Sequence, residues 1–164
     1  SKPFSSSTAT KRDKFRADHL GYIFQIFNLI PYLSIYENIF LPLQFSKHKY
    51  AKYKNREDIN NEIHRITDKL KIKKELLSKN ITKLSFGQQQ RVSVARALIG
   101  KPEIIIADEP TSALDIHNRE LFINLLLEEC ELSETTVIFV SHDPSLAPYF
   151  DKKIQMEDIN ASHN

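Results

Sequence analysis

Two short apolar runs without polar alternation, residues 104–107 and 137–140, constrain the fold of this chain more than any other feature. Continuously apolar strands are typical of a parallel sheet that is buried on both faces. The segment from about residue 118 to 132 has the length of a helix that crosses between two parallel strands. A third run, residues 20–27, is rich in aromatic and β-branched residues and predicts another strand. The sequence therefore predicts an α/β fold with a parallel sheet.

The region between the first and second strands is predicted to be mostly helical. Ser34 and Glu37 form a capping box for a helix over residues 35–41, which Pro42 interrupts or ends. In residues 57–70 the apolar positions fall at helical spacing and acidic residues occupy the first turn, as in an amphipathic helix.

A third helix carries signals for both of its ends. Ser85 and Gln88 form a second capping box, which opens a helix through Leu98. Gly100 is expected to close this helix in a left-handed conformation, and Pro102 follows it. We therefore predict a helical subdomain over residues 34–100, followed by the C-terminal part of the sheet-containing core over residues 101–164.

The start of the chain lacks hydrophobic periodicity and is rich in Ser, Thr and Lys. Residues 1–19 are therefore predicted to be a flexible lead-in to a core strand and loop at 20–33. The basic clusters in residues 11–16 and 47–56 are interpreted as solvated surface, because the net charge of +2 is nearly balanced. This balance gives no reason to expect nucleic acid as a partner.

Composition also limits the class of protein. At 164 residues and 41% hydrophobic content, the chain is long enough to bury one core with a small helical lobe. No stretch approaches the ~18 to 20 continuous apolar residues of a membrane span. The single cysteine, Cys130, cannot form an internal disulfide and is expected to be a buried thiol, so a cytosolic location is permitted.

Charged and polar side chains follow the ends of the predicted strands. Asp108 and Glu109 come directly after the run at 104–107, and His142 follows the run at 137–140. Because open parallel sheets bind ligands at the carboxyl ends of their strands, these side chains are expected to meet there. One carboxylate can hold Mg²⁺ while the other deprotonates water, and an imidazole can donate to a phosphate oxygen. For an isolated Asp-Glu pair, an ordinary structural role is equally open, and for a lone histidine a structural role is the favoured interpretation.

The turn at Ser85 offers a hydroxyl, free backbone N–H groups and the positive end of a helix, which together suit an anion such as a γ-phosphate. An ordinary capped helix is the alternative. Gln25, the polar residue in the run at 20–27, is either a ligand or a core amide. The other histidines are assigned structural or surface roles: His19, His48, His64, His117 and His163.

The order of these motifs resembles the ATPase subunit of an ABC transporter from its Q-loop onward, over about residues 20 to 158. The matching motifs are the Q-loop at Gln25, the signature Leu84-Ser-Phe-Gly-Gln88, the Walker B strand before Asp108 and Glu109, the D-loop Ser112-Ala-Leu-Asp115, and the H-loop at His142. The resemblance implies a partial P-loop NTPase (RecA-like) sheet with the α-helical signature lobe.

The resemblance also implies site roles. Asp108 would coordinate Mg²⁺, and Glu109 and His142 would be the catalytic base and the γ-phosphate contact. Gln25 would sense Mg²⁺ and water and link the site to a membrane subunit.

The remaining motif residues are implied to act across an interface between two nucleotide-binding subunits that meet head to tail. Ser85, Gly87 and Gln88 would bind nucleotide in the partner's site, and Ser112 and Asp115 would communicate across the interface. ATP and Mg²⁺ are the implied cofactors.

The segments around Pro31 and after the signature are similar in sequence to those of ABC exporters for lipoprotein release and for macrolide or peptide efflux. The implied function is ATP hydrolysis coupled to export through a transmembrane permease. The implied location is the cytoplasmic face of the plasma membrane, where the permease would hold the subunit as a peripheral protein.

The chain departs from the family pattern in two places that bear on activity. It has only three glycines, Gly21, Gly87 and Gly100, so it contains no Gly-x-x-x-x-Gly-Lys-[Ser/Thr] loop, and this Walker A segment is expected to precede Ser1. Phe86 stands where the signature normally has its first glycine. The isolated chain is therefore expected to be inactive and poorly soluble.

Two alternatives remain open at this point. The chain could be a truncated, non-catalytic ABC-like interaction module that lends its signature surface to a partner. A soluble ABC protein of DNA repair or translation would need a zinc or coiled-coil insertion or a second cassette, and the sequence has none of these.

Overall fold

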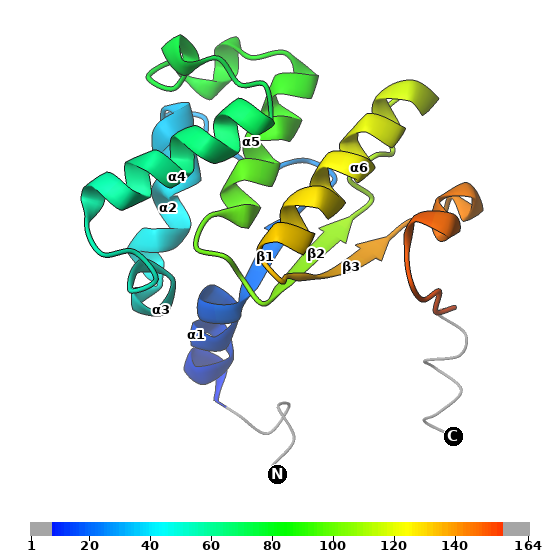
Figure 1. Ribbon diagram of the computed structural model, residues 1–164, viewed down its shortest axis with the longest axis horizontal. Coiled ribbons are helices and arrows are strands. Elements are labelled where there is room, and N and C mark those ends of the chain that lie inside the picture. Colours follow the sequence, from blue (N-terminus) through cyan, green and yellow to red (C-terminus); the bar gives the residue numbers. More distant parts are fainter. Residues whose placement is uncertain (1–7, 156–164) are drawn as a thin grey trace.

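Three parallel strands form the centre of the structure, a computed structural model that describes residues 8–155 (Figure 1). The strands are β1 Leu20–Ile23, β2 Ile104–Asp108 and β3 Thr136–Val140, in the order β1-β2-β3. Ile105 of β2 lies opposite Gly21 of β1 and Val137 of β3. The predicted parallel α/β fold is confirmed, although β1 ends at Ile23 and is shorter than the predicted run.

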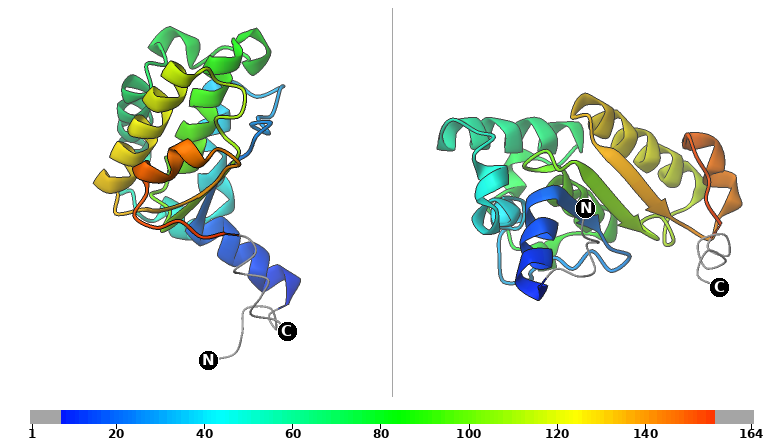
Figure 2. Two further views of the ribbon diagram at one scale, coloured as in Figure 1. Left: turned by 90° about the vertical axis from the view of Figure 1, so that its right-hand side faces the viewer. Right: turned by 90° about the horizontal axis from the view of Figure 1, so that it is seen from below.

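Residues 8–155 contain six α-helices beside this sheet. Helix α6 makes the crossover from β2 to β3, and α5 packs against β1, so that both cover the same face of the sheet (Figure 2). The helices are α1 Ala9–His19, α2 Ile35–Phe45, α3 Lys47–Tyr50, α4 Arg56–Lys69, α5 Phe86–Leu98 and α6 Ile116–Leu132. Short 3-10 turns lie at Lys74–Leu76, Ile81–Lys83 and Pro144–Tyr149. No helix within residues 8–155 combines the length and the apolar character needed to cross a membrane.

Helices α2, α4 and α5 pack against one another in a helical lobe. Ile39, Ile63 and Val92, one from each helix, are fully buried in a core that continues to Ile105 of the sheet. Pro42 does not end α2, which continues to Phe45. The helix loses only one backbone donor at Pro42, and the buried apolar residues on either side of it hold the following turn in the lobe.

Helix α5 has the ends that its sequence predicts. The hydroxyl of Ser85 accepts from the backbone N–H of Gln88, and the Gln88 side chain accepts from the backbone N–H of Ser85. Gly100 has φ 80°, and a Cβ there would lie 2.7 Å from the side chain of Lys49. Glycine is therefore required after α5 both by the backbone conformation and by this close packing.

The interpretation of the basic cluster in residues 47–56 as solvated surface is wrong for Lys49. Its side chain is 3% exposed, and its ammonium donates to the carbonyl of Leu20 at 2.7 Å. Burial, with the nearby charge of Lys52, lowers the pKa of Lys49 to about 8. One lysine of this cluster is thus a buried link between α3 and β1.

Residues 9–19, which the sequence assigns to a flexible lead-in, form helix α1. This helix is mostly polar and lacks acidic residues in its first turn, so hydrophobic periodicity gives no sign of it. It is capped by Thr8 and joined to the rest by the buried Asp18, which accepts from the hydroxyl of Ser46 at 2.6 Å. Tertiary contacts therefore hold the helix. Residues 1–7 and 156–164 lie outside the described part.

The expectation that the strands are buried on both faces is wrong for β3. Ile138 is 47% exposed and Val140 is 42% exposed, and they share one face of the strand. Within residues 8–155, helices cover only the opposite face, where Ile105 and Ala107 are buried. We call the uncovered side the open face. β3 also has no neighbour on its outer edge within this region, which is the kind of edge that promotes self-association.

Gly21 is predicted to be irreplaceable in β1, because a Cβ at this position would lie 2.5 Å from the carbonyl oxygen of Ala97 in α5. The clash is with backbone, so α5 and the sheet would have to separate. Gly21→Ala is therefore expected to lower the free energy of unfolding by about 1–3 kcal/mol, measured by urea denaturation. Gly87→Ala is the matched control, since a Cβ there meets nothing within 4 Å. An equal loss in both variants would contradict this packing.

Candidate functional site

Five of the predicted site residues gather where the strands end. Gln25 lies just after β1, Asp108 is the last residue of β2, and Glu109 follows it directly. Ser112 lies within the turn after Glu109, and His142 follows β3. We call these residues the carboxyl-end cluster. Their side chains come from three adjacent parallel strands, so the sheet itself places them at one edge.

Glu109 and His142 are in direct contact. The backbone N–H of His142 donates to Glu109 Oε1 at 2.8 Å, and His142 Nε2 lies 3.5 Å from the same oxygen. The Glu109 side chain is 16% exposed, whereas that of His142 is 98% exposed. The carboxylate is thus held in place, while the imidazole is free to approach a ligand from solvent.

The backbone at Glu109 has φ 46°, in the left-handed region that residues other than glycine seldom adopt. Its N–H donates to the carbonyl of Val140 at 3.0 Å, which continues the β2–β3 ladder one residue past β2. Residues held in such conformations cluster at functional sites. The hydrogen bond to Val140, the last residue of β3, therefore holds the backbone of Glu109, and the hydrogen bond from the His142 N–H directs its carboxylate.

Gln25 and Ser112 join the two loops at this edge. The Gln25 amide donates to Ser112 Oγ at 3.4 Å, and the Ser112 N–H donates to the carbonyl of Glu109 at 3.3 Å. Asp108 is exposed, and its carboxylate has no hydrogen bond or ion pair within the described residues. An ionised carboxylate and a carboxamide oxygen are ligands that Mg²⁺ prefers, so the residues present fit a hydrated Mg²⁺ ion.

Asp115 has a structural task that the sequence did not assign to it. Its carboxylate caps α6 by accepting from the backbone N–H of Asn118 at 2.9 Å and from the Asn118 amide at 2.7 Å. These hydrogen bonds lower the pKa of Asp115. The structure does not join Asp115 to the carboxyl-end cluster by a side-chain contact within residues 8–155.

Ser85, Gly87 and Gln88 form the first turn of α5, separate from the carboxyl-end cluster. Within the described residues, no hydrogen bond or ion pair joins the two groups. The side chains of Ser85 and Gln88 cap each other, so the backbone N–H groups of Phe86 and Gly87 are left without a described partner. Phe86 is half-exposed, and its ring centroid lies 4.7 Å from that of Phe27.

Sequence reasoning missed the ion pair between Arg119 and Asp143. Arg119 lies in the first turns of α6, and Asp143 follows His142 directly. Hydrogen bonds from Ser145, with a smaller contribution from Arg119, lower the pKa of Asp143. The pair connects the start of α6 to the loop that carries His142. The only sequence signal for this ion pair is that Asp143 directly follows His142.

Two side chains of α5 also support the cluster and were missed. The buried Gln90 donates to the carbonyl of Pro110 at 2.7 Å. Arg96 donates to the carbonyls of Phe27 and Asn28, each at 2.6 Å. The signature helix is thereby joined to the loops after β2 and β1. No local pattern marks either residue, since both acceptors are backbone atoms distant in sequence.

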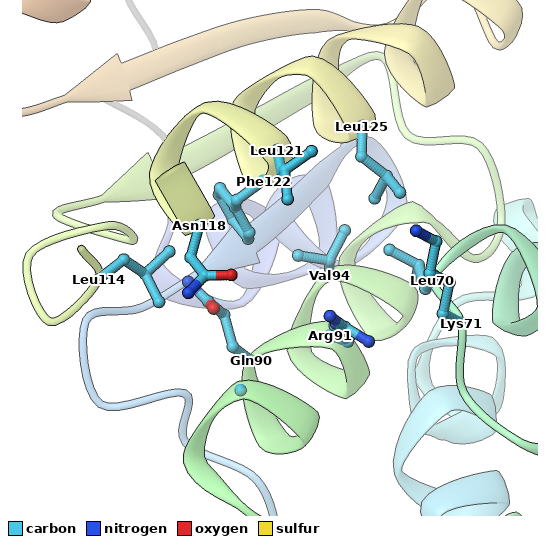
Figure 3. A pocket seen from close by; sticks show the side chains of 11 residues that line it. Leu70, Lys71, Gln90, Arg91, Val94, Leu114, Asn118, Leu121, Phe122 and Leu125 are labelled. Carbon is cyan, nitrogen blue, oxygen red and sulfur yellow. The ribbon is translucent and has the colours of Figure 1, made fainter. Parts of the chain in front are cut away.

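A pocket of about 300 Å³ lies between α5 and α6, but it is not the carboxyl-end cluster (Figure 3). Leu121, Phe122 and Leu125 of α6 face Val94 of α5 across it. Gly87 is the one predicted site residue in its lining. Its largely apolar lining contains no carboxylate that could hold a hydrated Mg²⁺ ion.

Comparison with known proteins agrees with this arrangement. The family model described as "ABC transporter" matches residues 3–112. A putative ABC transporter ATP-binding protein of Mycoplasma genitalium is 38% identical over 156 residues, which are 95% of this chain and 47% of that protein. The lipoprotein-releasing system ATP-binding protein LolD of Buchnera aphidicola is 38% identical over 143 residues, which are 87% of this chain and 60% of that protein. The chain thus spans about half to three fifths of the length of these curated relatives.

A solved structure shares both fold and sequence with the chain. It is the dimeric structure of a post-hydrolysis state of the ATP-binding cassette MJ0796 bound to ADP and Pi, from Methanocaldococcus jannaschii. The TM-score is 0.72 at 36% identity, and the match covers 88% of this chain and 61% of that chain.

Proposed function

Because this chain belongs to the ABC transporter family, we propose that it is part of an ATP-binding and ATP-hydrolysing subunit that powers export through a membrane permease. The observation that carries the proposal is the contact between Glu109 and His142 beside Asp108, at the carboxyl ends of β2 and β3. The subunit would work at the cytoplasmic face of the membrane, attached through the permease. Relatives named for lipoprotein release and bacitracin export support the direction of transport.

Asp108 and Gln25 would hold a hydrated Mg²⁺ ion, which neutralises charge on the phosphates of ATP. Glu109 would accept a proton from the attacking water, because its partly buried carboxylate is aimed by the His142 N–H and its backbone is held by Val140 without help from the ligand. The exposed imidazole of His142 would donate to the γ-phosphate. Positioning water and stabilising charge are the main demands of phosphoryl transfer.

The first turn of α5 would serve a second subunit. Its N–H groups at Phe86 and Gly87, which have no partner among residues 8–155, and the positive helix end suit a γ-phosphate. No hydrogen bond or ion pair of this described region joins them to the carboxyl-end cluster. A head-to-tail dimer, in which each signature turn completes the other subunit's site, accounts for that separation. The dimeric structures of MJ0796 support such an assembly. Ser112 and Asp115 would lie beside the interface.

A bound nucleotide also needs a glycine-rich phosphate loop, which these 164 residues do not contain. We infer that another segment of the subunit supplies it. A parallel strand carrying that loop would fit the free edge of β3, and it would bring the phosphates toward Glu109 and His142. The exposed apolar side chains of Ile138 and Val140 support an additional layer on the open face.

The second candidate function is a non-catalytic interaction module. The half-exposed ring of Phe86 favours it, because the side chain stands at the point where a γ-phosphate would approach the turn. Such a module would bind a partner cassette through its signature surface without hydrolysing ATP itself.

A spliced cassette separates the two candidates. We define it as the segment of MJ0796 that precedes the region matched by this chain, joined to the chain at the start of that region. The spliced cassette is expected to hydrolyse MgATP, measured as phosphate release, and the chain alone is expected not to. Circular dichroism and thermal melting establish that each protein is folded. A folded spliced cassette that binds MgATP without turnover would favour the interaction module.

A further inference from the structure

Three potential metal ligands meet at the amino ends of the strands, opposite the carboxyl-end cluster. Glu103 Oε2 lies 3.1 Å from His19 Nδ1, and Glu103 Oε1 lies 3.4 Å from His48 Nε2. One ligand atom from each residue lies within 4.8 Å of the others. The two imidazole rings are tilted, with centroids 4.9 Å apart. We call these three residues the amino-end cluster.

The cluster is distant from the carboxyl-end cluster and belongs to different segments. His19 is the last residue of α1, His48 is in α3, and Glu103 precedes β2. Helices α1 and α3 lie near the lower end of the sheet in Figure 1. Asp108 lies five residues after Glu103, a distance of about 16 Å along a strand.

The backbone that carries these ligands is well held. The N–H of Glu103 donates to the carbonyl of His19 at 3.1 Å, and its own carbonyl accepts from Thr136 at 2.9 Å. The buried Asp18 and Ser46 join α1 to α3 at 2.6 Å. The three side chains therefore converge because their backbones are fixed, which reduces the ordering that a bound ion would require.

The spacing suits a tetrahedral ion. With metal–ligand distances of 2.0–2.1 Å, adjacent ligand atoms around zinc are about 3.3 Å apart. The two carboxylate–imidazole distances of 3.1 and 3.4 Å, which are measured to different oxygens of Glu103, lie close to that value. One ligand atom from each of the three residues lies within 4.8 Å of the others, so the side chains would have to draw closer together to share one ion. Two imidazoles and one carboxylate, with an open position for water, are a ligand set that zinc uses in proteins. We propose that His19, His48 and Glu103 form a binding site for a divalent transition-metal ion of the zinc type.

The competing interactions at the cluster are weak enough for an ion to replace. Lys52 Nζ lies 3.6 Å from Glu103 Oε1, but it also donates to the carbonyl of Lys101 at 2.6 Å and keeps that partner when it moves away. All three side chains are a third to a half exposed, so an ion and its water can enter from solvent.

The proposal is tested by titrating the EDTA-treated chain with Zn²⁺ in a calorimeter. Saturable binding of one ion per chain is expected. His48→Ala and Glu103→Gln are each expected to weaken Zn²⁺ binding by at least roughly 10- to 100-fold. That is the loss expected when only a group that supports a metal ligand is removed. His64→Ala, which removes a histidine of α4 outside the cluster, is the matched control and is expected to bind as the wild type does.

A second readout is the melting temperature. Zn²⁺ is expected to raise it in a concentration-dependent way in the wild type and in His64→Ala, because the ion joins three segments only in the folded chain. Glu103→Gln keeps groups that can hydrogen-bond both imidazoles, so it tests the metal without removing the packing. Absence of one-to-one binding in the folded wild type, or equal loss in His64→Ala, would overturn the proposal. Neither result bears on ATP hydrolysis, since the two clusters share no residue.

Discussion

In the spliced cassette, Glu109→Gln is expected to lower the rate of MgATP hydrolysis by about 10²–10⁴-fold while leaving MgATP binding close to that of the unsubstituted protein. The amide keeps the shape of the side chain and can still accept from the His142 N–H, which now lies 2.8 Å from Oε1. It cannot accept a proton from water. The rate is measured as phosphate release under saturating MgATP, and binding is measured by calorimetry.

Glu128→Gln is the matched control, since Glu128 is an exposed carboxylate on α6 outside the site. It is expected to leave both turnover and binding unchanged. Persistent hydrolysis in Glu109→Gln would show that another group deprotonates the water, and the assignment of Glu109 would have to be abandoned.

The second large effect is on stability. Ile105→Ala is expected to lower the free energy of unfolding by about 2–5 kcal/mol, because Ile105 is fully buried at the centre of β2. The substitution would leave a cavity between the sheet and the helices on its covered face. Urea denaturation of the chain, with an unchanged m-value, measures this loss.

Ile138→Ala is the matched control on the same sheet. Ile138 is 47% exposed on the open face of β3, so its truncation is expected to change stability by no more than about 0.5 kcal/mol. A loss comparable to that of Ile105→Ala would mean that the open face is covered in solution. Dependence of the unfolding midpoint on protein concentration would then identify self-association as the cause.

Much of the fold could be predicted because its signals are local. The capping boxes at Ser34 and Ser85, the glycine after α5 and the apolar runs of β2 and β3 each act within a few residues. Buried Cys130 was likewise predictable from its apolar neighbours, and burial raises the pKa of its thiol to about 12.

The features that could not be predicted depend on distant contacts. Helix α1 has no apolar stripe, and the contact of Asp18 with Ser46 that anchors it spans 28 residues. The apolar run of β3 indicates burial on both faces, but one face is open because no helix within residues 8–155 covers it. A one-dimensional pattern cannot show which neighbours are present.

In the candidate site, too, the features that depend on local sequence were predictable and those that depend on distant contacts were not. Parallel strands require Glu109 and His142 to emerge at one edge, and their contact agrees with that expectation. The left-handed backbone of Glu109 is held by a hydrogen bond to the carbonyl of Val140, 31 residues away. The residue types at these positions do not predict that conformation. The sequence assigns His19 and His48 structural or surface roles because neither has a placement comparable to that of His142 after a strand. Their shared partner, Glu103, is far from both in sequence. The chemical roles of the site residues remain predictions.

The most direct measurement is a structure of the Glu109→Gln spliced cassette with MgATP bound. We expect a dimer in which Mg²⁺ and the γ-phosphate lie between Asp108 and His142 of one subunit, and the first turn of α5 from the other subunit closes the site. A triphosphate bound elsewhere, with Asp108 and His142 directed away from it, would contradict the account.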